Sequence, residues 1–466
     1  MTDIVWLDAT ELARRIRARE LSPVEVLRAH RERAEAVNGA INAIVTPIEE
    51  AEELARAAEA AVLRGDELGP LHGVPFTIKD SFDTAGVRTT RGSLLFAEHV
   101  PAEDAVAVAR LRAAGAIPLG KTNLPEFALW WETGNLVFGT TRNPWNLERT
   151  AGGSSGGEAA AVAAGLSPLG IGSDLGGSIR LPAHYCGVVG LKPTHGRVPL
   201  TGHWPEVILR FMHVGPLART VRDAALALAV VAGPDGRDWH AQPAPPPVIP
   251  EGAPLPPLRV GVLGGSAFGP LDAEVAAAVA RAASALGELG CSVEIDRVPA
   301  LEDNDWNVLT LGLYGAEGRA YLDGVVGARS AELHPFLRRR LSLPLPSLED
   351  YLVVEAKVEA LRRELALFFL RHDVLLCHAV PITAHEHEAT EVLIAGAAHP
   401  ARTTMRATIP FDLSGSPALV VPFGWSREEL PIGVQVVGPR FDETAVLRVG
   451  LALEALGGGF RRRPPL

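Results

Sequence analysis

The stretch GGSSGGEAAAVAAGLSPLGIGSDLGGSIR occupies residues 152–180 and contains two clusters of glycine and serine. The first cluster, residues 152–157, leads into a run of small, helix-forming residues. The second cluster, residues 172–180, contains Ser178 after two glycines. Consecutive small residues ending in serine suit a loop whose backbone N–H groups converge on one oxyanion. Two such clusters at a defined distance predict a serine-based site rather than a flexible linker.

A serine nucleophile needs a neighbouring group that takes its proton. Neither cluster contains histidine, and the nearest ones, His184 and His195, follow the second cluster. Lys79 ends an apolar stretch that predicts a buried strand. Burial lowers the pKa of lysine, whereas arginine keeps its proton. Only four of the 44 basic residues are lysine, so a lysine at this position suggests a role that arginine does not fill. Lys79 is therefore the better candidate base, and a salt bridge with Asp80 is the alternative.

Two other patterns suggest different enzymes. The first cluster fits the GxSxG elbow of a Ser-His-Asp α/β-hydrolase on either serine, but an elbow follows a strand and residues 143–150 look like a polar loop. That class stays an alternative. Residues 115–122 match the phosphate-loop pattern GxxxxGK[ST]. Since a helix precedes and the middle positions are apolar with a proline, we interpret this stretch as a helix-to-strand connection.

Three histidines, His378, His385 and His387, are candidate metal ligands near the C-terminal third of the chain. Alternate residues of an extended chain point to opposite sides, and no HExxH motif is present. The sequence therefore predicts no metal site.

Composition restricts the function classes. The 466 residues are 47% hydrophobic and carry a formal net charge of −11, which is typical of a globular protein and disfavours nucleic acid as a partner. Three widely spaced cysteines indicate a reducing compartment. The N-terminus is acidic, and the longest apolar stretch, residues 224–233, is about half the ~20 residues of a membrane span. We therefore expect a cytoplasmic protein that does not bind membranes.

The order of predicted elements indicates an α/β architecture. The first 65 residues are rich in helix formers, and the pattern Ser22-Pro23-Val24-Glu25 predicts a helix start. Eight prolines in residues 243–257 predict a semi-rigid spacer. Helical and strand patterns alternate on both sides of it, which predicts layers around one large sheet.

Four motifs together resemble the amidase signature family. They are GVPFTIKD at 73–80, GGSSGGE at 152–158, GSDLGGSIR at 172–180 and CGVVGLKPT at 186–194. The resemblance is dense over residues 69–225 and returns at 373–450, about half of the chain. It implies a three-layer α/β/α fold with a large mixed central β-sheet. We expect one domain, 1–466, composed of a helical part (1–65), the signature core (69–225), the proline-rich spacer (240–258), a variable substrate-side region (259–370) and a C-terminal return to the core (371–466).

The resemblance also implies site residues. Lys79 takes the position of the catalytic lysine, Ser154 that of the serine behind a cis peptide bond, and Ser178, 24 residues later, that of the nucleophile. The implied oxyanion hole consists of the amides of Leu175, Gly176, Gly177 and Ser178, and the implied supporting residues are Ser155, Asp174 and Arg180.

The implied activity is hydrolysis of a small-molecule carboxylic amide through an acyl-enzyme, without a metal or organic cofactor, in a chain that can form a homodimer. One branch of the family is the glutaminase subunit of a tRNA-dependent amidotransferase, which is our alternative. This chain has Leu129, Trp130 and Trp131 where that branch has small residues near the substrate. We therefore expect a stand-alone amidase whose pocket takes an apolar or aryl acyl group. A non-catalytic binding protein is less favoured because no member of the triad is missing.

Overall fold

The computed structural model describes residues 4–245, 247, 254–457 and 462–466. Within them, eleven strands form one sheet: β1 (Ile44–Pro47), β2 (Pro75–Lys79), β3 (Ile117–Thr122), β8 (Leu169–Asp174), β9 (Val189–Lys192), β10 (His213–Ala218), β11 (Arg259–Leu263), β12 (Ser292–Asp296), β13 (Val374–His378), β16 (Ala418–Trp425) and β17 (Pro431–Val437). Their order is β1-β3-β2-β8-β10-β9-β16-β17-β13-β11-β12. Strands β2, β3 and β8 are parallel, whereas β8 and β10 are antiparallel. The large mixed sheet predicted from the sequence is confirmed.

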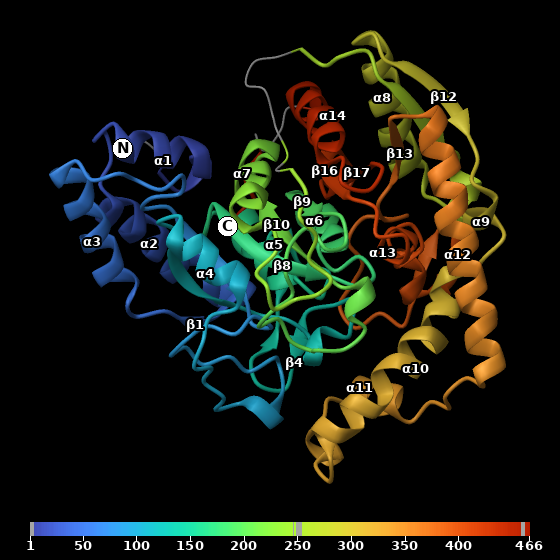
Figure 1. The fold of residues 1–466 in the computed structure, drawn as a ribbon, viewed down its shortest axis with the longest axis horizontal. Helices are drawn as coiled ribbons and strands as arrows, with labels where there is room; N and C mark the ends of the chain where they lie inside the picture. Colours follow the sequence, from blue (N-terminus) through green and yellow to red (C-terminus); the bar gives the residue numbers. More distant parts are fainter. Residues whose placement is uncertain (1–3, 246, 248–253, 458–461) are drawn as a thin grey trace.

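The described α-helices are α1 (Ala9–Arg17), α2 (Pro23–Ile41), α3 (Ala51–Arg64), α4 (Val106–Ala113), α5 (Gly156–Ala163), α6 (Arg180–Cys186), α7 (Val221–Val231), α8 (Ala273–Glu288), α9 (Pro299–Glu302), α10 (Trp306–Val326), α11 (Pro335–Leu341), α12 (Leu348–Arg371), α13 (Ile409–Leu413) and α14 (Glu443–Gly457). The predicted start of α2 is confirmed, because the Ser22 hydroxyl accepts hydrogen bonds from the amides of Val24 and Glu25. Figure 1 shows α1, α2 and α3 at one end of the molecule and α10, α11 and α12 at the other.

Helices cover both faces of the sheet. Successive strand residues enter different hydrophobic cores: Leu375 and Cys377 of β13 belong to one, and Val374 and Leu376 to the other. Helices α5 and α6 contribute to the first core, and α4, α7, α8 and α14 to the second. This alternation produces the three-layer α/β/α arrangement expected from the sequence.

Two segments differ in how well their local structure was predicted. The polar segment 143–150, expected to be a loop, contains β7 (Asn146–Thr150), which pairs with β6 (Arg142–Asn143) in a hairpin outside the main sheet. That prediction was wrong, because short polar strands satisfy their backbone groups in a surface hairpin without an apolar pattern. The helix-to-strand interpretation of residues 115–122 is confirmed, since Gly120, Lys121 and Thr122 lie in buried β3. Part of the predicted spacer, residues 246 and 248–253, lies outside the described residues.

The remaining small strands lie in two further hairpins. Strand β4 (Gly134–Asn135) pairs with β5 (Gly139–Thr140), and β14 (Glu391–Ile394) pairs with β15 (Ala397–Pro400). The first of these hairpins follows the segment of Leu129, Trp130 and Trp131, and therefore lies close in sequence to the candidate site.

Candidate active site

Lys79 is the last residue of β2, whose five residues are all buried. Its Nζ lies 2.7 Å from Ser154 Oγ and 3.0 Å from Ser173 Oγ. Burial lowers the pKa of Lys79 to about 7, against the opposing effect of Asp174 and Glu158. Strand β2 thus holds an amine that can be neutral near pH 7 in hydrogen-bonding distance of the Ser154 hydroxyl.

Three of the four lysines are fully buried, and their contacts distinguish them. Burial lowers the pKa of Lys121 to about 8 and that of Lys192 to about 7, so a lowered pKa does not single out Lys79. Lys121 Nζ donates to the Phe82 carbonyl and to two threonine hydroxyls, and Lys192 Nζ donates to the Ser416 carbonyl. The amines of Lys121 and Lys192 thus each connect separate segments of the chain. The side-chain partners of Lys79 are instead the hydroxyls of two serines in the two clusters.

The two serine clusters meet in space. The peptide bond between Gly153 and Ser154 is cis. The next residue, Ser155, donates its backbone N–H to the Ser178 carbonyl at 3.1 Å, and its hydroxyl donates to the Ser173 carbonyl at 3.3 Å. Ser154 is buried, whereas Ser178 is only partly buried at the turn between β8 and α6. The partly exposed Ser178 is therefore bonded through its backbone to the residue after Ser154, whose buried hydroxyl contacts Lys79.

The loop of residues 174–180 is organised by the Asp174 carboxylate. It accepts hydrogen bonds from the amides of Gly177 at 2.5 Å and Ile179 at 3.0 Å. The amides of Leu175, Gly176 and Ser178 have no acceptor among the residues that the structure describes. Of the four amides expected to form the oxyanion hole, three are thus open to a ligand and that of Gly177 is already bonded.

Arg180 connects this loop to the C-terminal part of the chain. Its guanidinium donates to Asp174 Oδ1 at 2.9 Å, Asp412 Oδ2 at 2.7 Å, the Thr408 carbonyl at 2.8 Å and Gln435 Oε1 at 3.1 Å. Burial acts to raise the pKa of Asp174, but Arg180 holds it well below its ordinary value. The supporting roles expected of Asp174 and Arg180 agree with these contacts.

Three residues near the site were missed in the sequence. Ser173 contacts Lys79, the Tyr314 hydroxyl of α10 donates to the Leu175 carbonyl at 2.8 Å, and the Thr408 hydroxyl donates to the Gly176 carbonyl at 2.7 Å. A serine next to Asp174 in the second cluster was a usable signal for Ser173. Tyr314 and Thr408 are 139 and 232 residues from their partners, and no local pattern marks them.

Glu158, the last residue of the first motif, lies beneath the site in α5. Its carboxyl group accepts hydrogen bonds from Thr77 Oγ1 at 2.6 Å and Thr122 Oγ1 at 2.9 Å. Burial raises its pKa to about 8. At neutral pH it is therefore mostly protonated, so the ionised Asp174 is the main negative charge that acts on Lys79.

The aromatic residues predicted to line the substrate pocket form a stack. The rings of Trp130 and Trp131 are 3.7 Å apart between centroids, and Phe336 of α11 stacks on Trp130 at 4.4 Å. Trp131 is buried in the first core, whereas Leu129 and Trp130 are partly buried. The backbone of the next residue, Glu132, packs against Gly153, so the stack adjoins the segment that carries Ser154.

Four of the five histidines considered in the sequence have backbone partners, and the ring of the fifth, His378, packs edge-on against Phe268. His184 contacts the carbonyls of Gly433 and Ile382, and His195 contacts that of Leu209. These contacts do not support the Ser-His-Asp alternative. His385 and His387 contact the carbonyls of Glu386 and Leu147. Across the described residues, no three His, Cys, Asp or Glu side chains form a group that could hold a metal ion.

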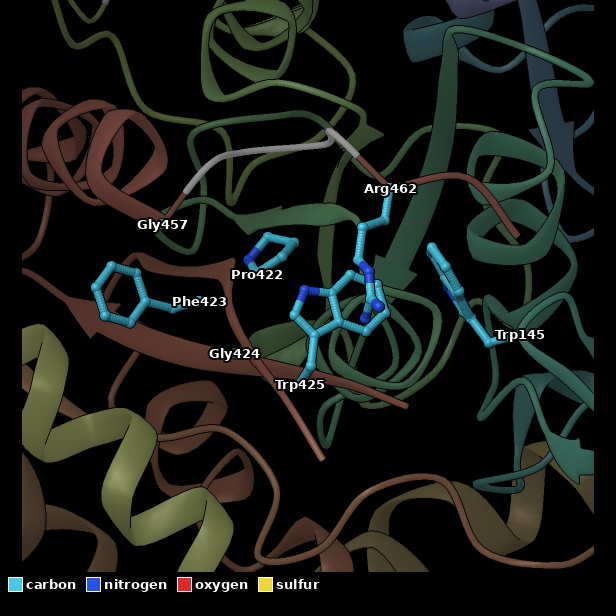
Figure 2. A pocket seen from close by; sticks show the side chains of 8 residues that line it. Trp145, Pro422, Phe423, Gly424, Trp425, Gly457 and Arg462 are labelled. Atoms are coloured by element: carbon cyan, nitrogen blue, oxygen red, sulfur yellow. The ribbon is translucent and has the colours of Figure 1, made fainter. Parts of the chain in front are cut away.

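A small hollow lies away from these residues, at the end of β16 (Figure 2). Arg462 lies over the ring of Trp425 at 4.5 Å from its centroid, and Trp145 faces the same ring edge-on. None of the predicted catalytic residues lines this hollow.

Among the helices that the structure describes, none is long and apolar enough to cross a membrane.

Comparison with known proteins identifies the family of the chain. The family model described as Amidase matches residues 25–447, so the chain belongs to the amidase family, the amidase signature enzymes that its motifs resemble. It is therefore an enzyme of an amide-hydrolysing class.

Individual relatives span the whole chain. A glutamyl-tRNA(Gln) amidotransferase subunit from Moorella thermoacetica is 38% identical over 100% of this chain and 99% of that protein. The structure of 6-aminohexanoate cyclic dimer hydrolase is similar with a TM-score of 0.87 and 33% identity, covering 99% of both chains. A chain from a vestigial protein complex that reveals the origins of an s-triazine catabolic enzyme gives a TM-score of 0.90 and 34% identity over 97% of this chain and 99% of that chain.

Proposed function

We propose that this chain hydrolyses a carboxylic amide through an acyl-enzyme on Ser178. The observation that carries the proposal is the buried Lys79 amine, 2.7 Å from Ser154 Oγ, on a segment bonded to Ser178 through Ser155. Neutral Lys79 takes the proton of Ser154, which takes that of Ser178 as Ser178 Oγ attacks the amide carbon. The developing oxyanion accepts hydrogen bonds from the open amides of Leu175, Gly176 and Ser178.

The same groups then complete the reaction in reverse. The proton held by Lys79 and Ser154 passes to the departing ammonia or amine, and the C–N bond breaks. Water then attacks the acyl-enzyme, with the relay accepting its proton, and releases the carboxylate and Ser178. Every step uses side chains and amides of this chain.

Trapping the intermediate tests the proposal directly. A reactive anilide or ester mixed with the protein and quenched in acid is expected to leave one acyl group on Ser178, located by fragmenting the tryptic peptide 150–180, which also contains Ser154, in a mass spectrometer. Acylation of another residue, or of the Ser178→Ala variant to the same extent, would contradict it.

The substrate has two candidates. The names of the curated relatives support the glutaminase-subunit hypothesis better than the stand-alone amidase that we first expected from the sequence. The stack of Trp130, Trp131 and Phe336 favours the second candidate, an amidase for apolar or aryl acyl groups. We further propose that a glutaminase subunit would work with partner chains, and that the chain can form a homodimer. A cytoplasmic location is also proposed, and three buried free cysteines support it.

Ammonia release separates the two candidates. For a glutaminase subunit, glutamine is expected to be hydrolysed by the purified chain, and kcat/KM is expected to rise when a co-purifying partner chain is added back. Hexanamide and benzamide, which both release ammonia, serve as the apolar and aryl acyl comparison. Hydrolysis of these two without measurable hydrolysis of glutamine would instead identify the stand-alone amidase.

A further inference from the structure

A group of buried polar atoms without partners lies next to the serine site. Within the described part of the chain, Trp131 Nε1, Glu132 Oε1, Tyr185 Oη and His385 Nε2 have no hydrogen-bond partner. These four side chains are at most 9% exposed. A buried polar group without a partner is costly, and native structures contain few. Four of them in one place, which we call the polar cluster, point to a ligand.

The polar cluster surrounds the two glycines before Ser154. A Cβ on Gly153 would lie 2.8 Å from the backbone of Glu132, and one on Gly152 would lie 3.1 Å from the Tyr185 ring. The His385 carbonyl accepts a hydrogen bond from the amide of Thr150 at 2.9 Å. His385 Nδ1 is 4.0 Å from Glu132 Oε1, and the rings of His385 and Tyr185 are perpendicular at 5.7 Å. The cluster therefore encloses the segment that presents Ser154.

The contacts that His385 and Glu132 already make indicate whether their free atoms donate or accept hydrogen bonds. His385 Nδ1 lies 2.8 Å from the Glu386 carbonyl, so Nδ1 carries the proton and Nε2 is an acceptor. Burial lowers the pKa of His385 to about 4, which keeps the ring neutral at pH 7. Glu132 Oε2 accepts a hydrogen bond from the Glu388 amide at 2.9 Å, which leaves Oε1 free. Burial raises the pKa of Glu132 to about 7, so Oε1 is an acceptor in the ionised carboxylate, which predominates above pH 7. With the Trp131 and Tyr185 donors beside these two acceptors, the cluster suits a ligand that supplies N–H groups.

We propose that Glu132 and His385 bind an N–H-bearing group on the acyl part of the substrate, while Trp131 and Tyr185 donate to an oxygen next to it. This inference rests on the proposed hydrolysis at Ser178 and adds a substrate class to it. An ammonium beside a carboxylate, as in glutamine, and a second carboxamide both provide these groups. A purely apolar acyl group would leave all four polar atoms unpaired, so the cluster selects against it.

Paired substrates test the inference without changing the protein. Glutamine is compared with glutaramic acid, which lacks its ammonium, and glutaramide with 5-oxohexanamide, which carries a methyl group where glutaramide has its second NH₂. We expect kcat/KM to be about 10-fold or more higher for the N–H-bearing member of at least one pair. The pair that shows the preference identifies the group.

Three variants locate the preference. His385→Phe keeps a ring against Tyr185 but removes Nε2, and is expected to reduce the preference about 5-fold or more. Glu132→Gln retains an oxygen for the Glu388 amide and replaces the free acceptor by a donor, so the preference is expected to fall as well. His399→Phe, in strand β15 where His399 pairs with Val392, is the control outside the polar cluster and is expected to keep the wild-type ratio.

The outcomes separate this inference from the proposed function. Equal kcat/KM within both pairs, with hydrolysis that Ser178→Ala abolishes, overturns the inference and leaves the function standing. Calorimetry with the Ser178→Ala protein gives a readout independent of catalysis, in which the N–H-bearing member is expected to bind about 10-fold more tightly. Equal binding overturns the inference, whereas preferential binding without any wild-type hydrolysis or acylation of Ser178 contradicts the proposed function instead.

Discussion

The Ser178→Ala variant is expected to lose amide hydrolysis by about 10⁴-fold or more in kcat, with little change in KM. The change removes the atom that forms the acyl bond but leaves the loop intact, because the Ser178 backbone carbonyl still accepts from Ser155. Ser178 is partly exposed at a turn, so alanine causes no packing loss. Steady-state ammonia release from the best substrate measures the effect.

Ser167→Ala provides the control for this prediction. Ser167 is close to Ser178 in sequence but is fully buried; its hydroxyl donates to the Leu169 carbonyl and contacts no candidate catalytic group. We expect it to keep kcat within about 3-fold of wild type, at a stability cost of about 1 kcal/mol. If Ser178→Ala retained the activity of this control, the nucleophile would be a different residue.

Lys79→Arg and Lys79→Met are both expected to lower kcat/KM by about 10³-fold or more. Arginine keeps its proton and methionine has none to exchange, so neither accepts the proton of Ser154. Methionine is close in length to lysine, which separates loss of the base from overpacking by the larger arginine. Lys357→Arg, a helix position outside the site, is expected to behave as wild type.

The pH profile gives this prediction a second readout. Burial lowers the pKa of Lys79 to about 7, and only the neutral amine accepts a proton. In the free enzyme, kcat/KM is therefore expected to fall about 10-fold per pH unit below pH 7 and to level off above about pH 8. A flat profile from pH 5.5 to 8.5 would exclude a base with this pKa, and the residual activity of Lys79→Met is expected to lack the rise.

The sequence was sufficient for the parts of the site that lie in continuous motifs. The two glycine and serine clusters and the strand ending at Lys79 are short segments whose composition limits their backbone geometry. The structure accordingly places Lys79 against Ser154 and bonds Ser155 to Ser178. The sheet followed from the alternation of strand and helix patterns, because such patterns record which faces are buried.

Contacts between distant segments could not be predicted in the same way. Tyr314, Thr408 and Asp412 reach the loop of residues 174–180 from three elements that are adjacent only after folding. The proposed oxyanion hole needed the same information: four amides were expected from the sequence, but the structure shows that the Gly177 amide is bonded to the Asp174 side chain. The polar cluster joins positions 131, 132, 185 and 385, and each of these residues is ordinary in its own segment.

The bond from the Tyr314 hydroxyl to the Leu175 carbonyl ties α10 to the loop that presents the open amides. Helix α10 belongs to residues 259–370, which we expected from the sequence to form a substrate-side region. If the open amides bind the oxyanion as we propose, a change in this helix that alters substrate preference would also shift those amides. In engineering, a segment exchanged from a relative would then need a replacement for that one hydroxyl to keep turnover.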